Sequence, residues 1–153
     1  DIRNANVYVE KHYSTYNEIG LAQSKLWDAG TVCITIAANI AETAILKYPC
    51  CFPDSVIGLK TNPHYVDGLF LFYTLQKYKS ELQKLGKGSA QDNINLGTFE
   101  TKTFPFPNID TQMEIVNTLN SIKVKVDVLQ ANYDKISAEC DALKQALLKQ
   151  VFE

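Results

Sequence analysis

The chain has 153 residues, of which 46% are hydrophobic and 10% aromatic, and its formal net charge is −2. This composition supplies a real core for one ordinary domain and excludes a disordered chain. The negative balance argues against a generically basic nucleic-acid binder, and no apolar run approaches the roughly 20 residues that span a bilayer.

The first 30 residues predict one strand and one short helix. Residues 2–9 indicate a strand, and the chain opens in the middle of it, so we expect that a natural N-terminus is missing. The polar residues 10–20 favour a loop. Residues 21–29 then predict a short helix that ends at Gly30, since glycine is a usual stop signal.

The next segment predicts the body of a sheet. Residues 31–37 are β-branched and apolar, which is typical of a buried strand, and residues 38–41 are expected to turn the chain. Residues 43–48 and 55–60 predict two more strands, separated by the Pro-containing residues 49–54.

A helix and a last strand follow. Asn62 and Pro63 fit a helix entrance, and residues 65–85 predict a helix that Gly86 ends. Residues 102–106 indicate a short strand before the chain breaks at two prolines. This order predicts an α+β fold with a mixed or antiparallel sheet, followed by a long coiled-coil helix.

The last 40-odd residues carry the strongest pattern. A helix is expected to start near Asp110, with Asp110 or Asn108 as its N-cap, and to run roughly 60 Å. Its apolar residues alternate in steps of four and three, the a/d spacing of a coiled coil. We call these ten residues the seam: Ile115, Leu119, Ile122, Val126, Leu129, Tyr133, Ile136, Cys140, Leu143 and Leu147.

The seam predicts a partner helix. Burying each aliphatic member contributes roughly 1.5–3 kcal/mol, so the seam outweighs the surface charges in deciding what the helix pairs with. The functional interpretation is a spacer that holds two copies of the preceding domain apart. The alternatives are an arm packed on its own domain or a generic dimer handle, and the seam does not decide between parallel and antiparallel pairing.

Several motifs together carry a family resemblance. The loop 88–93 reads Gly-Ser-Ala-Gln-Asp-Asn, residues 104–107 read Phe-Pro-Phe-Pro, and a helix with Asp-x-Gln-x-x-Ile-Val-x-x-Leu follows through Leu119. Over nearly its whole length the chain resembles the DNA specificity subunits of type I restriction–modification systems. The family's hinge usually continues with Glu-Gln, where this chain has Thr111-Gln112.

The resemblance implies a division of the chain and a set of partners. Residues 1–107 would be a target recognition domain, incomplete at its N-terminus, and residues 108–153 the dimerisation and spacer helix. Because a full subunit carries two of each, we expect a half-subunit or a fragment. The implied partners are double-stranded DNA, methyltransferase (modification) subunits, a restriction subunit and a second copy of the helix, with no membrane. Similar proteins are non-catalytic, and S-adenosylmethionine is expected in the modification subunit, with no cofactor in this chain.

Candidate DNA contacts fall in two places. Asn and Gln side chains can pair with adenine, and small polar or basic groups can hold phosphates. The candidates near the start are Arg3, Asn4 and Asn6, followed by Tyr13, Tyr16 and Asn17; those in the loop are Lys87, Ser89, Gln91, Asn93 and Asn95. Lys77, Lys79, Lys84 and Lys87 could form a phosphate-facing strip, or a solvated helix face.

Enzyme interpretations are weak. Cys50 or Cys51 with His64 could be imagined as nucleophile and base, but no third orienting partner follows a known pattern, and paired zinc-ligand spacings are absent. Cys33 and Cys140 fit buried thiols, so we expect a reduced, cytoplasmic protein. The competing function is a coiled-coil assembly or adaptor protein whose globular part binds protein and has no DNA role.

Overall fold

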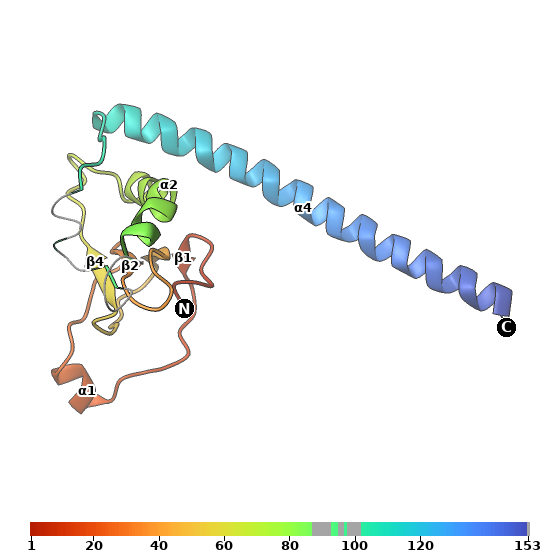
Figure 1. Cartoon of the computed structure of the whole chain (residues 1–153), viewed down its shortest axis with the longest axis horizontal. Helices are drawn as coiled ribbons and strands as arrows, with labels where there is room; N and C mark the ends of the chain where they lie inside the picture. The colour runs from red at the N-terminus through yellow and green to blue at the C-terminus, as the bar shows by residue number, and fades with distance from the viewer. Residues whose placement is uncertain (87–92, 95–96, 98–101, 153) are drawn as a thin grey trace. The chain divides into compact units, whose positions relative to one another are not determined.

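The computed structural model describes residues 1–86, 93–94, 97 and 102–152. They form two compact units, Asp1–Glu114, which we call the head, and Ile115–Glu153. The predicted α+β class, with a small mixed sheet and a long C-terminal helix, is confirmed (Figure 1). None of the helices in the described residues has the length and apolarity needed to cross a membrane.

The sheet of the head has four strands in the order β1-β3-β2-β4. These are β1 (Tyr8–Val9), β2 (Val32–Thr35), β3 (Thr43–Leu46) and β4 (Val56–Leu59). β2 lies antiparallel to both β3 and β4, whereas β1 pairs parallel to β3, with Tyr8 opposite Ile45. The sheet is therefore mixed, and the strands predicted at 31–37, 43–48 and 55–60 are all present in shorter form.

Each face of the sheet has its own core because side chains alternate along a strand. Val32, Ile34 and Ile45 pack with Leu75 and Leu82 of helix α2 (Gly68–Gly86), all of them at most 4% exposed. The opposite face buries Val9 of β1, Cys33 of β2, and Ala44 and Leu46 of β3.

An aromatic pair covers that second face. The rings of Trp27 and Phe52 stack with centroids 5.1 Å apart, and Lys25 Nζ lies 3.8 Å from the Trp27 ring. A Cβ at Gly58 of β4 would lie 2.8 Å from both rings, so the missing side chain lets the pair sit directly on the strand. Trp27 also exchanges backbone hydrogen bonds with Cys50.

The N-terminal predictions need two corrections. The strand expected over residues 2–9 is only Tyr8–Val9, and the helix expected over 21–29 is instead α1, Glu18–Ala22. The side chain of Asn17 accepts a hydrogen bond from Gly20 N (2.8 Å) and so starts α1 within the predicted loop. Gly30 does not end a helix; it adopts φ +83° in the turn before β2.

Helix α2 starts later than Asn62-Pro63 predicted. Asn62 forms a turn of its own: its Oδ1 accepts from His64 N, and its backbone oxygen accepts from Tyr65 N and Val66 N. Asp67 then caps the helix, since its Oδ1 accepts from Phe70 N (2.8 Å). The helix does end at Gly86, as expected.

The strand predicted over residues 102–106 is wrong. Pro105 has no N–H to donate to a ladder, and the two phenylalanines pack instead against α2. Phe104 meets Tyr78 edge-on with ring centroids 5.2 Å apart, and Phe106 meets Phe70 at 5.6 Å. The Phe-Pro-Phe-Pro segment therefore packs against α2 through its two aromatic rings.

The long helix is confirmed as one unbroken element. α4 (Ile109–Phe152) has 44 residues, about 66 Å at the usual rise. Of the two caps considered, Asn108 fills the role: its Oδ1 accepts from Thr111 N at 2.9 Å.

Truncating the core of α2 should test this packing. Leu82 is fully buried, so Leu82→Ala is expected to lower the free energy of unfolding by about 2–5 kcal/mol, because it leaves a cavity. Leu85 on the same helix is 47% exposed, and Leu85→Ala should cost less than about 1 kcal/mol. Urea denaturation of both variants measures the difference, and equal losses would contradict the assigned core.

Candidate nucleic-acid interface and pairing seam

A groove of about 670 Å³ opens in the head between the N-terminal segment and the sheet. Its polar lining includes Arg3, His12, Tyr16, Asn39 and Tyr48. His12 Nδ1 lies 3.1 Å from the Tyr48 hydroxyl, which ties the N-terminal segment to the residues after β3. The groove therefore joins segments that are far apart in the sequence.

The structure separates the N-terminal DNA-contact candidates. Arg3 and Tyr16 both line the groove, whereas Asn4, Asn6 and Tyr13 are exposed without being among its lining residues. Asn17 uses its amide oxygen to cap α1. Of this set, Arg3 and Tyr16 are the two that the fold brings together.

The loop candidates can be placed only in part. Lys87, Ser89, Gln91 and Asn95 lie outside the described residues, while Asn93 is described and exposed. Ile94 beside it is buried in the main core, and its N donates to Ile36 O at 3.0 Å. The segment is thus anchored to the sheet at this point.

The lysine strip on α2 is divided by its contacts. Lys79 is half-buried and forms an ion pair with Glu42 (2.7 Å). Lys77 lies 5.3 Å from the centre of the Tyr78 ring, and Lys84 is exposed. Lys79 therefore fastens α2 to the residue that precedes β3.

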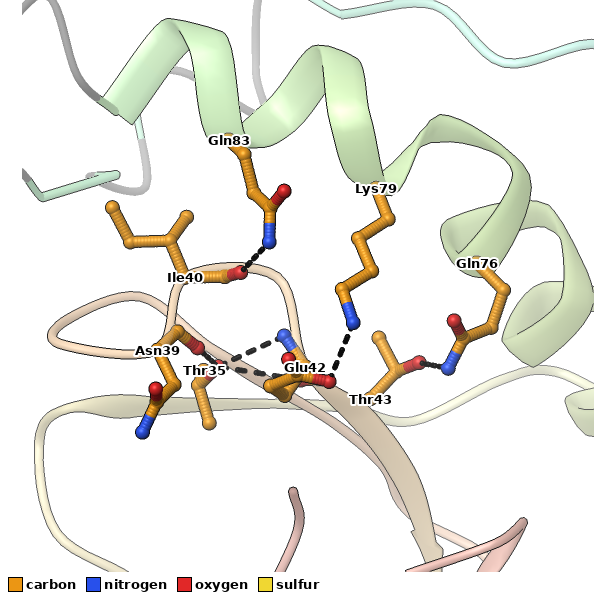
Figure 2. Close-up of polar contacts among 8 residues, drawn as sticks. All are labelled: Thr35, Asn39, Ile40, Glu42, Thr43, Gln76, Lys79 and Gln83. Carbon is orange, nitrogen blue, oxygen red and sulfur yellow. Dashed lines mark hydrogen bonds and ion pairs between the residues drawn. The ribbon is translucent and has the colours of Figure 1, made fainter. Parts of the chain in front are cut away.

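The turn between β2 and β3 was expected at residues 38–41, and it is strained. Ala38 and Ala41 have φ of 59° and 63°, the left-handed region, which costs an alanine about 1–2 kcal/mol. Thr35 offsets the strain: its hydroxyl contacts the backbone oxygen of Asn39 and accepts from Glu42 N at 3.0 Å (Figure 2). Nothing in the sequence signals this strain, because neither position is a glycine.

Gln112 fixes the start of α4, and sequence reasoning missed it. Its side chain is fully buried, and Nε2 donates to Tyr65 O (2.8 Å) and Pro107 O (2.7 Å). Its Oε1 accepts from Asp67 N (3.0 Å), next to the cap of α2. The available signal was position: Gln112 stands one heptad before Leu119, a polar residue in line with the seam.

The seam is exposed in the single chain. Seven of its members from Ile122 onward are 52–71% exposed: Ile122, Val126, Leu129, Tyr133, Ile136, Leu143 and Leu147. Cys140, which we expected to be buried, is also exposed. Additional apolar residues off the seam are exposed too, among them Val124 and Val128.

The structure gives the cysteine–histidine interpretation no support. Cys50 and Cys51 line the groove, but His64 is not among its lining residues. Burial, and then the neighbouring Cys51, raise the pKa of Cys50, which disfavours the reactive thiolate. Within the described residues, no group of three or more His, Cys, Asp or Glu side chains could hold a metal ion.

An α+β head joined to a long helix with an unpaired heptad seam defines a class of proteins that carry a binding domain on a pairing helix. Within that class, the sequence of this chain identifies one family. Residues 3–138 match the model of the type I restriction modification DNA specificity domain, and the chain belongs to this family.

Known relatives agree with this assignment. The putative type I restriction enzyme MjaX specificity subunit of Methanocaldococcus jannaschii is 24% identical over 124 residues, which cover 81% of this chain and 29% of that protein. A structure reported for complex assembly and conformational transition of the type I R-M system is 25% identical with a TM-score of 0.74, covering 84% of this chain and 32% of that one.

A second solved structure shares the fold. The crystal structure of the HsdS subunit from Thermoanaerobacter tengcongensis is 19% identical, with a TM-score of 0.64 over 84% of this chain and 29% of that one. The chain thus spans about a third or less of the length of these relatives.

Proposed function

We propose that this chain is a DNA sequence-recognition component of a type I restriction–modification complex. Its head reads half of a bipartite target, and α4 pairs with a second helix that carries or joins another head. The observation that carries the proposal is an exposed seam on the same chain as a DNA specificity domain. Two heads on a stiff helical pair would lie at a fixed separation, which matches a target made of two half-sites.

The chemistry would belong to other subunits. In this proposal the chain is non-catalytic and scaffolds modification subunits, which bind S-adenosylmethionine and methylate adenine; a restriction subunit is a further partner. The similar structure that concerns complex assembly of a type I R-M system supports such an arrangement. A cytoplasmic location remains a prediction from the cysteine pattern.

Methylome sequencing tests the proposal. Strains with and without this gene are compared, and we expect a bipartite adenine motif that is methylated only when the gene is present. Complementation with the intact gene should restore the motif. If the motif persists after deletion, the proposal is wrong, and the adaptor function without a DNA role takes its place.

DNA binding by the isolated chain is expected to be weak. The chain has one arginine, and the half-buried Lys79 is already paired with Glu42. Phosphate contacts supply most non-specific affinity, so a chain with a net charge of −2 is expected to bind little DNA at physiological salt. A gel shift should show the assembled complex bound at concentrations where the chain alone is free; tight binding by the chain alone would contradict this prediction.

Cysteine labelling provides a test of pairing. Cys140 lies on the seam and is exposed in a single chain, so pairing through the seam should slow its alkylation. Cys33 serves as an internal control: burial raises its pKa to about 12, so it should remain unlabelled whether or not the helix is paired. Mass spectrometry at low and high chain concentration measures both sites, and a concentration-independent rate at Cys140 would argue against self-pairing.

A further inference from the structure

The β2–β3 turn, residues 38–41, is held by several hydrogen bonds to Thr35. Two of its alanines, Ala38 and Ala41, adopt left-handed backbone conformations. The Thr35 hydroxyl contacts the backbone between them, at Asn39 O, and just after the second, at Glu42 N. Ala41 N also donates to Thr35 O at 2.8 Å. A strained conformation persists only where its surroundings determine it fully, and such sites cluster where function needs a fixed shape.

Helix α2 supports the turn from one side, as Figure 2 shows. Gln83 Nε2 donates to Ile40 O (3.1 Å), Lys79 pairs with Glu42, and Gln76 Nε2 donates to Thr43 Oγ1 (2.7 Å). The Ile40 side chain is only 8% exposed and belongs to the main core. Gln76, Lys79 and Gln83, which are spaced about one helical turn apart on α2, therefore hold the turn and the start of β3.

The other side of the turn is open. Ala38 and Asn39 are exposed, and both line the groove that also contains Arg3 and Tyr16. In Figure 2 the Asn39 amide points away from α2, and within the described part of the chain it has no hydrogen-bond partner. The backbone of Asn39 is fixed through its oxygen, while its amide remains available to a ligand.

An asparagine amide offers one donor and one acceptor at fixed spacing, which matches N6 and N7 of adenine in the major groove. Arg3 on the same groove can hold a phosphate and set the register. We infer that the β2–β3 turn is a base-reading edge of the head and that Asn39 reads an adenine of the target duplex; this inference rests on the proposed function. A pre-ordered turn loses little freedom on binding, so its contacts translate into discrimination between bases.

The test uses the assembled complex and the motif that the methylome defines for the unaltered gene. Its affinity is measured for the cognate duplex and for duplexes with each base pair changed in turn. The salt is kept low enough that phosphate contacts retain every duplex. Asn39→Ala should abolish discrimination at one adenine of the motif, from about 5- to 150-fold down to near equality, and leave the other positions unchanged.

Two further variants separate base reading from folding. Asn117→Ala changes an exposed asparagine of α4 outside the seam and should leave every position unchanged. Thr35→Val keeps Asn39 but removes the hydroxyl that positions it, so discrimination should weaken at the same adenine. A merely structural role for Thr35 would not move the preference at one base.

The possible outcomes distinguish a failure of this inference from a failure of the proposed function on which it rests. If the unaltered gene specifies no methylation motif, the proposed function fails and the inference fails with it. If the motif exists and Asn39→Ala keeps the original discrimination at every position, or loses it equally at all of them, the turn does not read that adenine, and the proposed function stands.

Discussion

Leu129→Asp is expected to convert paired chains into single chains. Leu129 lies near the middle of the seam and is 67% exposed in the single chain. A pair of identical helices contains the substitution twice, so roughly 1.5–3 kcal/mol of apolar burial is lost on each side, and each buried carboxylate adds a desolvation cost. The dissociation constant should therefore rise by a factor on the order of 10³ or more.

The neighbouring residue provides a matched control. Val128 is also apolar and 56% exposed, but it lies one position away from the seam. Val128→Asp places the same charge on α4 and should leave pairing nearly unchanged. Sedimentation of both variants against the unaltered chain measures the association. If the two variants dissociate equally, or if neither does, the seam is not the pairing surface.

Gln112→Ala should give the largest loss of stability among polar substitutions considered for the head. The substitution leaves Asp67 N, Tyr65 O and Pro107 O without the partner that now satisfies them. A buried polar group without a hydrogen bond costs about 1–3 kcal/mol, so the total loss should be about 2–4 kcal/mol. In a chain of this length that corresponds to a fall in melting temperature of roughly 5–15 °C.

A second glutamine of α4, Gln130, serves as a control that has the same side chain in an exposed position. Gln130 is exposed, and its Nε2 donates to Asp134 one turn further on (2.8 Å). Gln130→Ala should change the stability by less than about 0.5 kcal/mol. Gln112→Glu keeps an acceptor for Asp67 N but places a carboxylate beside two carbonyl oxygens, so it should be at least as destabilising as alanine. Melting curves that coincide for Gln112→Ala and the unaltered chain would show that the cluster adds nothing.

The elements that sequence patterns predicted well are those that packing alone determines. The β-branched run of β2 and the apolar face of α2 bury regularly spaced side chains, and the heptads of α4 place apolar residues at a regular spacing along one helix. Such a repeat is visible in the sequence. Residues 38–41 were recognisable as a turn because the two strands on either side of them must reverse. The family resemblance rested on motifs at the hinge and in the helix, and it is confirmed by the match over residues 3–138.

The elements that the sequence did not predict depend on contacts between distant residues. Asn62 and Pro63 suggested the start of a helix, but the Asn62 turn and the Asp67 cap moved it to Gly68. Residues 102–106 have strand-like composition, but the rings of Phe104 and Phe106 pack against α2 and the segment forms no strand.

The candidate site was harder still to predict from the sequence. Arg3 and Tyr16 were chosen for their chemistry, but only the fold shows that they share a groove with Asn39. Asn39 lies 36 residues after Arg3 in the chain and was assigned only to a turn. Its orientation depends on a left-handed alanine and a threonine hydroxyl, and neither has a sequence signature.

The way in which α2 supports the β2–β3 turn has a consequence for how this head can diverge. Ile40 and Ala41 are anchored in the interior, whereas Ala38 and Asn39 belong wholly to the outer surface. Replacing the Asn39 side chain therefore changes what the head presents and removes nothing from the packed interior. Under the proposed function, target preference could thus change at this position at little cost in folding stability.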